Sequence, residues 1–197
     1  FKAAFSMDGP LEMLFAKAIN KCYIDYGWKK TSKYGDPDVQ IFGIYEYILC
    51  FKKVMQSMKY GKETQSNLET AGLLRLMNLI EQNSNIYDNI NTIPIEDLLS
   101  KPTVLELNSI DNQEQKALII ALLLSSVCVY TKNNQKGDGD LKNVILIDEA
   151  HVLLDGGTDS DVAGKSKETT VKTIQNMIAE IRSYGTSIII ADQMPSK

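Results

Sequence analysis

A short apolar run followed at once by two carboxylates constrains this chain more than any other stretch. Val144 to Ile147 are four consecutive branched apolar residues, too few for a helix and too apolar for an exposed edge strand. Such a run is typical of a parallel β-strand buried on both faces. Asp148 and Glu149 follow where that strand would end. Ligands of open α/β sheets bind at the carboxyl ends of the strands, so both carboxylates are candidate site residues.

A second segment predicts another strand of the same kind. A helix starting near Glu168 carries apolar residues on one face, and Gly185 supplies the left-handed residue that ends it. Ser187 to Ala191 then has the composition of a second strand buried on both faces. Gln193 lies just beyond its carboxyl end, where its amide can both donate and accept hydrogen bonds.

The apolar strand ending in Asp-Glu has the form of a Walker B motif. Three further motifs accompany it: Ala150-His151, Arg182 to Gly185, and Gln193 to Ser196. Together they resemble the HerA/FtsK superfamily of ring-forming, DNA-pumping P-loop ATPases, and most closely its HerA-like and conjugation-ATPase branch. The motifs are specific in combination and weak singly, and the resemblance covers most of the chain.

The resemblance implies a nucleotide site with ATP and Mg²⁺ as cofactors. Asp148 would help to hold the Mg²⁺, and Glu149 would polarise the attacking water. Gln193 would sense the γ-phosphate or orient that water, and the arginine matched by Arg182 is associated with the nucleotide site in the family. His151 is expected to hydrogen-bond near the site rather than to bind a metal.

Each of these residues also has a structural interpretation. The Asp148-Glu149 pair could be a solvated acidic turn, and Gln193 a surface residue before a Met-Pro turn. Arg182 could simply offset the helix dipole at the helix end. Glu106 is a further polar group that the sequence places at the same sheet edge.

The chain lacks the glycine-rich loop that cradles phosphates in a P-loop ATPase, GxxxxGK[ST]. Gly164-Lys165-Ser166 matches its end, but Asp159 stands where the first glycine is required. The preceding residues also form no strand pattern of their own. We therefore expect a fragment of the motor domain that lacks the Walker A loop and is inactive by itself.

The expected fold class is α/β: part of a RecA-like parallel sheet with flanking helices, preceded by an α-helical region. The domain prediction is an α-helical region over 1–100 and a RecA-like part over 101–197 that carries the Walker B and sensor strands. Thr103 to Leu107 is expected as a third parallel strand, beside the strand of Val144. Residues 155–167 read as a polar loop, with a mobile loop near the nucleotide or the DNA pore as the alternative.

The remaining helices are expected in five places: from Gly9-Pro10 to a stop at Gly27, over 41–58, over 64–81, over 93–99, and from about 111 to 130, the last apolar nearly all round.

Composition limits the partners and the compartment. The net charge of −4 argues against a broad basic face for nucleic acid, so DNA contact requires a few local residues. Three cysteines in apolar patterns suggest core thiols of a cytoplasmic protein rather than a disulfide framework. The run from Ala117 to Tyr130 is too short to span a bilayer, so no membrane segment is expected.

Two functions from different classes remain. The first is an ATPase motor, active in the full-length protein as a homo-oligomeric hexamer that works on DNA or within a membrane-associated secretion or conjugation machinery. The second is a non-catalytic interaction or regulatory domain that retains the ATPase sheet. The intact residues Asp148, Glu149 and Gln193 favour the first, and the sequence does not separate conjugation, DNA processing and defence.

Overall fold

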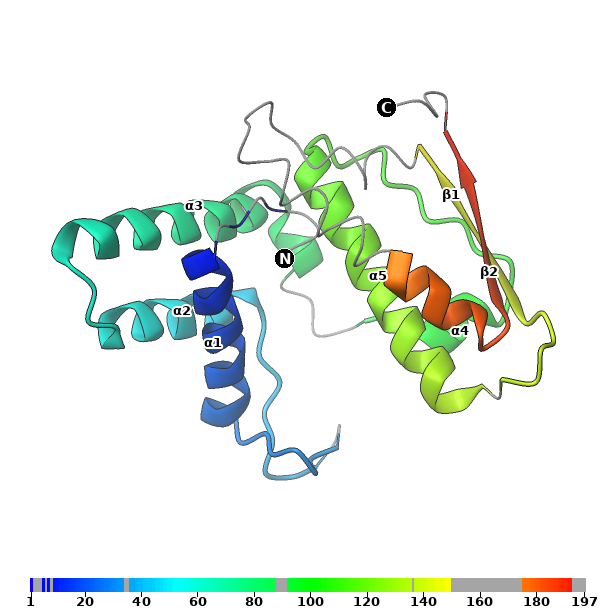
Figure 1. The fold of residues 1–197 in the computed structure, drawn as a ribbon, viewed down its shortest axis with the longest axis horizontal. Coiled ribbons are helices and arrows are strands. Elements are labelled where there is room, and N and C mark those ends of the chain that lie inside the picture. The colour runs from blue at the N-terminus through cyan, green and yellow to red at the C-terminus, as the bar shows by residue number, and fades with distance from the viewer. Residues whose placement is uncertain are drawn as a thin grey trace. The chain divides into compact units, whose positions relative to one another are not determined.

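The computed structural model describes residues 1, 5, 7, 9–33, 36–87, 92–135, 137–149 and 175–192. The chain is mixed α/β and falls into two compact units, Met7–Thr92 and Ile93–Lys197 with Phe1–Ser6. The labelled elements (Figure 1) are α1 Gly9–Asp25, α2 Ile44–Ser57, α3 Lys62–Tyr87, α4 Ile95–Leu99, α5 Gln113–Asn134, β1 Asn143–Asp148 and β2 Thr186–Ala191. A further helical segment covers 175–182.

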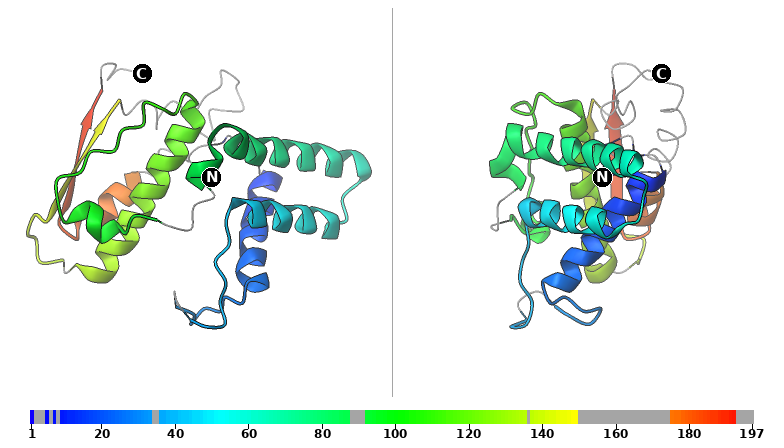
Figure 2. Two further views of the ribbon diagram at one scale, coloured as in Figure 1. Left: turned by 180° about the vertical axis from the view of Figure 1, so that it is seen from behind. Right: turned by 90° about the vertical axis from the view of Figure 1, so that its left-hand side faces the viewer.

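The Met7–Thr92 unit is built from three helices. Figure 2 shows α2 and α3 running side by side, with α1 crossing them. The Phe51 ring of α2 lies edge-on to Phe15 of α1, with ring centroids 5.3 Å apart. Phe51 also packs over Gly72 of α3, where a Cβ atom would lie only 2.3 Å from the ring. The rest of the core around them is apolar: Leu11, Leu14, Ala18, Cys22, Val54, Met55, Leu76 and Leu79.

The predicted helix stop at Gly27 is confirmed. Gly27 has a φ of 81° and its N–H donates to the Ile24 carbonyl at 3.2 Å, while the Trp28 N–H donates to the Tyr23 carbonyl at 2.8 Å. These two bonds are the Schellman pattern, which satisfies the last carbonyls of a helix. The Trp28 indole N–H then donates to the Gln40 carbonyl at 2.8 Å, which ties the following loop together.

The helix expected over 41–58 begins later, at Ile44. The Glu46 carboxylate accepts the Gly43 N–H at 2.8 Å, so the side chain three residues into the helix satisfies the backbone just before it. Ile41 stays outside the helix and is half exposed. The next helix, α3, is longer than the predicted range of 64–81 at both ends.

Helix α5 in the second unit begins where its capping residue predicts. The Asn112 side chain accepts the Gln115 N–H at 3.1 Å, which satisfies one free backbone donor of the first turn. The expectation that this helix is buried all round is wrong. Leu122 and Val129 are more than half exposed, because the described elements cover only one side of α5.

The same helix bears on the membrane prediction. With 22 residues, α5 is longer than the run from Ala117 to Tyr130 and is long and apolar enough to cross a membrane by length and composition alone. This is weak evidence, because the core helix of a soluble protein passes the same test.

The two strands form a parallel sheet in the order β1-β2, in the register Asn143↔Thr186 to Asp148↔Ala191. The predicted strands are therefore confirmed as parallel neighbours. In Figure 1, α5 and the helix 175–182 lie on one side of this sheet. Both strands were expected to be buried on both faces, and this is wrong for the part of the chain that the structure describes. Leu146 is 64% and Ile189 51% exposed on the shared outer face.

The strand predicted at Thr103 to Leu107 does not form. These residues are coil, and Val104 is 83% exposed. A strand needs a partner for its backbone hydrogen bonds, and among the described residues β1 pairs only with β2. The predicted loop over 155–167 lies outside the described residues, as does the first part of the helix from Glu168.

Gly185 opens the pairing of the two strands. Its φ is 85°, as the sequence predicts, and its carbonyl accepts the N–H groups of Lys142 at 2.8 Å and Asn143 at 3.2 Å. A Cβ atom on Gly185 would lie 2.2 Å from the Asp140 carbonyl oxygen. Only glycine therefore allows the two chain segments to approach at the amino end of the sheet.

We expect Gly185→Ala to destabilise the protein by about 3 kcal/mol, since it combines a left-handed conformation with a backbone clash. Gly139→Ala is the matched control, because Gly139 has a φ of 87° and no atom lies within 4 Å of the position that its Cβ atom would take. That variant should lose only about 1 kcal/mol. Urea unfolding of both variants measures the difference, and equal losses would contradict the close approach at Gly185.

A second prediction concerns the helical unit. The buried Tyr47 hydroxyl donates to the Phe15 carbonyl at 3.0 Å, so Tyr47→Phe should cost about 1–2 kcal/mol of unfolding free energy. Tyr45 is 43% exposed, and Tyr45→Phe should change stability by less than about 0.5 kcal/mol. Chemical denaturation of the two variants tests the bond; an equal effect in both would show that it contributes nothing.

Candidate functional site

The carboxyl ends of the two strands lie side by side. Asp148, the last residue of β1, is the register partner of Ala191, the last residue of β2. Asp148 is exposed, so its carboxylate faces solvent at this edge of the sheet. Asp192 follows directly on β2. Gln193, the third predicted site residue at this edge, lies outside the described residues, as does His151.

Glu149 has an unusual backbone. Its φ is 53°, a left-handed value that no other non-glycine residue has in the described part of the chain. Its N–H donates to the Asp148 carboxylate oxygen Oδ1 at 3.0 Å. A non-glycine residue in this region costs on the order of 1–3 kcal/mol and is found where surrounding structure imposes it. The backbone therefore bends at Glu149, directly after β1. The two carboxylates belong to adjacent residues, and the second of these has the strained φ.

This arrangement suits a hard divalent cation. Mg²⁺ in proteins is commonly held by one or two carboxylates, with waters and substrate phosphates completing six oxygen ligands. Asp148 offers such a carboxylate in solvent, and Glu149 adds a second negative charge beside it. Among the described residues there is no group of three or more His, Cys, Asp or Glu side chains that could enclose a metal. The donor set therefore fits a cation shared with a phosphate ligand and not a closed structural metal site.

Arg182 lies at the other end of the sheet. It ends the helix 175–182, and its carbonyl accepts the N–H of Gly185 at 3.1 Å, immediately before β2 begins. The six residues of β2 separate that point from the carboxyl edge by on the order of 15 Å. Within one chain the structure therefore does not bring Arg182 together with Asp148 and Glu149.

Glu180 joins the helix that carries Arg182 to α5, a contact that the sequence did not predict. Its carboxylate accepts a hydrogen bond from the Lys132 ammonium of α5 at 2.7 Å and one from the Cys128 thiol at 3.7 Å. The Lys132 bond lowers the pKa of Glu180 and raises that of Lys132. Ile181 beside it is fully buried. No local sequence pattern predicts this contact, because it joins residues that are far apart in the chain.

Glu106 was expected at the end of a strand, but it lies exposed in the coil between α4 and α5. The strand that was to place it at the sheet edge does not form, so that part of the prediction is wrong.

Comparisons of the chain with protein-family models, with curated proteins and with solved structures found no match.

An alanine variant is usually more stable than a glycine variant, and the left-handed backbone of Glu149 should reverse this order. Glu149→Gly should be more stable than Glu149→Ala by about 1 kcal/mol, because only glycine adopts this φ without strain. Both changes remove the same carboxylate, so their difference isolates the backbone. Thermal or urea unfolding of the pair measures it. An alanine variant as stable as the glycine variant would show that the residue after β1 has an ordinary negative φ.

Proposed function

We propose that this chain is part of an ATP-hydrolysing motor of the HerA/FtsK type, and that its sheet belongs to a larger RecA-like sheet. One observation supports this above all: an acidic pair stands at the carboxyl end of a parallel strand, beside the carboxyl end of its neighbour. Strand ends of this kind are where open α/β sheets bind nucleotides. The motifs shared with that superfamily add to it.

The proposed chemistry is hydrolysis of ATP. Mg²⁺, when bound, neutralises charge on the phosphates as it develops in the transition state. Asp148 would hold that ion through its exposed carboxylate, whose Oδ1 already fixes the turn by accepting the Glu149 N–H. Glu149 would orient and polarise the attacking water from the adjoining step of backbone. Gln193 would contact the γ-phosphate or the same water.

In this proposal the cradle for the phosphates lies outside these 197 residues, because the sequence contains no complete GxxxxGK[ST] pattern. Arg182 lies at the opposite end of β2 from Asp148, so any part that it plays in hydrolysis requires the site of a neighbouring subunit. This agrees with the proposed hexamer. We further propose a cytoplasmic location, with DNA or a membrane-associated secretion or conjugation machinery as the partner.

The second candidate is a non-catalytic interaction or regulatory domain that keeps the ATPase sheet. The outer face of the sheet is apolar, and Leu146 and Ile189 on it are more than half exposed. A surface of this kind suits contact with another protein segment, which favours the second candidate. The two candidates differ in one measurable property, which is nucleotide turnover in the longer protein.

The chain by itself should not bind ATP tightly, because its carboxylates repel a triphosphate and it carries no complete phosphate-binding loop. Isothermal titration calorimetry of the 197 residues with Mg-ATP should give no micromolar affinity. Micromolar binding would contradict the proposal that the loop lies elsewhere.

In the longer protein, Glu149→Gln should retain ATP binding and lose most of its turnover, about 10²–10⁴-fold, since an amide cannot accept the proton of the water. Glu63→Gln is the matched control: it removes an exposed carboxylate of α3, in the unit that contains neither strand, and should leave turnover unchanged. Steady-state phosphate release measures both. Normal turnover in Glu149→Gln would remove Glu149 from its role and favour the second candidate.

A further inference from the structure

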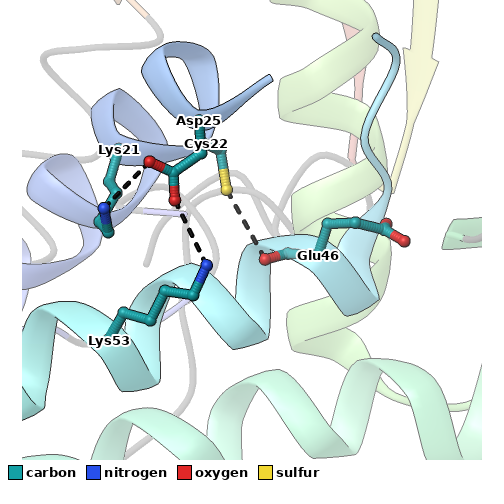
Figure 3. A network of polar contacts seen from close by, with 5 residues as sticks. All are labelled: Lys21, Cys22, Asp25, Glu46 and Lys53. Atoms are coloured by element: carbon teal, nitrogen blue, oxygen red, sulfur yellow. Dashed lines mark hydrogen bonds and ion pairs between the residues drawn. The ribbon is translucent and has the colours of Figure 1, made fainter. Parts of the chain in front are cut away.

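Two of the three cysteines lie in the core of the helical unit. Cys22 of α1 is 0% exposed and Cys50 of α2 is 2% exposed, and both are free thiols. Figure 3 shows the Cys22 side chain pointing from α1 toward the backbone of α2. The sequence predicts them only as core thiols.

The helices approach closely at this point. The Cys22 thiol donates to the Glu46 carbonyl of α2 at 3.7 Å, so a side chain with one atom beyond Cβ reaches the backbone of the facing helix. Cys50 follows Glu46 by one helical turn. Side chains on a helix lean toward its amino terminus, over the preceding turn. The Cys50 thiol therefore lies over the turn that the Cys22 thiol contacts, and the two buried thiols are close neighbours.

Ion pairs link the two helices beside the thiols. Asp25 of α1 pairs with Lys21 of the same helix at 3.0 Å and with Lys53 of α2 at 3.4 Å, as Figure 3 shows. Asp25 lies three residues after Cys22 and Lys53 three residues after Cys50, so the bridge flanks the thiols almost one turn further along both helices. The ion pair to Lys53 therefore shows that the turns after the two cysteines also face each other.

Burial keeps the pair reduced while the unit is closed. It raises the pKa of Cys22, and the neighbouring Cys50 adds to the shift. A thiol reacts as its thiolate, so reaction requires that α1 and α2 first separate and admit water.

We propose that Cys22 and Cys50 form a reversible disulfide that joins α1 to α2 when the protein meets a low-molecular-weight disulfide such as oxidised glutathione. One cysteine thiolate attacks the reagent, forms a mixed disulfide and releases one glutathione thiolate. The second cysteine thiolate then attacks the protein sulfur of the mixed disulfide and releases the second glutathione. The protein loses two thiol protons and two electrons, and one disulfide becomes two glutathione thiols.

The cross-link would stabilise the unit Met7–Thr92. It removes open conformations of the loop between residues 22 and 50 from the unfolded chain, and disulfides of this loop size stabilise domains measurably. Cys128 offers an internal control: it is also buried, but its thiol contacts the Glu180 carboxylate and not another thiol.

The test uses the whole 197-residue chain in a series of reduced and oxidised glutathione mixtures, with low urea to let the helices open. Free thiols are then blocked with N-ethylmaleimide and the protein is mapped by mass spectrometry. We expect a Cys22–Cys50 peptide two hydrogens lighter than its reduced parts, with Cys128 still blocked by the reagent. The midpoint of thermal unfolding should rise by roughly 10 °C on oxidation.

Cys128→Ala should give the same cross-link and the same shift, whereas Cys22→Ala and Cys50→Ala should give neither. The peptide map of the unmutated chain decides the matter even if these two variants fold poorly. Glutathione retained on Cys22 or Cys50 without ring closure, or cross-links that join chains through Cys128, would overturn the proposal. The proposal would also be overturned if both thiols stayed fully reduced at a urea concentration at which the backbone amide hydrogens of α1 exchange with solvent.

Discussion

The parallel pairing of β1 with β2 is the constraint on which the rest of the second unit depends. Parallel neighbours require the chain to return from the carboxyl edge of β1 to the amino edge of β2. The return ends at Gly185, whose carbonyl accepts two N–H groups from the start of β1 and whose lack of a side chain permits the approach to Asp140. The pairing brings the two carboxyl ends together, and so gives Asp148 and Glu149 a common edge with Asp192, which follows β2.

The same pairing leaves the sheet incomplete among the described residues. Parallel sheets are normally covered on both faces, yet the outer face of this one exposes Val144, Leu146 and Ile189. The strain at Glu149 and this uncovered face point in one direction. A costly backbone conformation beside an acidic pair is understandable at a ligand site, and an apolar face is understandable where further structure covers it. Both support the proposed motor domain, and the second also suits an interaction domain.

The helical unit Met7–Thr92 depends on side-chain packing between helices and not on strand pairing. Its core is held by aromatic contacts around Phe51 and by the approach of α1 to α2 at Cys22. The ion pairs of Asp25 are partly exposed and are therefore worth little in stability; they join turns of α1 and α2 that face each other. This packing brings together two buried thiols from helices that are separate in the sequence, and the proposed disulfide rests on that proximity.

Local sequence patterns by themselves determined the helices, the strands β1 and β2 and the glycine stops at Gly27 and Gly185, because short-range preferences and apolar periodicity act within a few residues. They also marked the acidic pair after β1. Three features were decided only by tertiary structure. Thr103 to Leu107 has the composition of a strand but remains coil, since a strand exists only with a paired neighbour. The separation of Arg182 from Asp148 follows from the direction of β2. The meeting of Cys22 with Cys50 follows from the crossing of α1 and α2, because no local pattern states which segments distant in sequence will pack together.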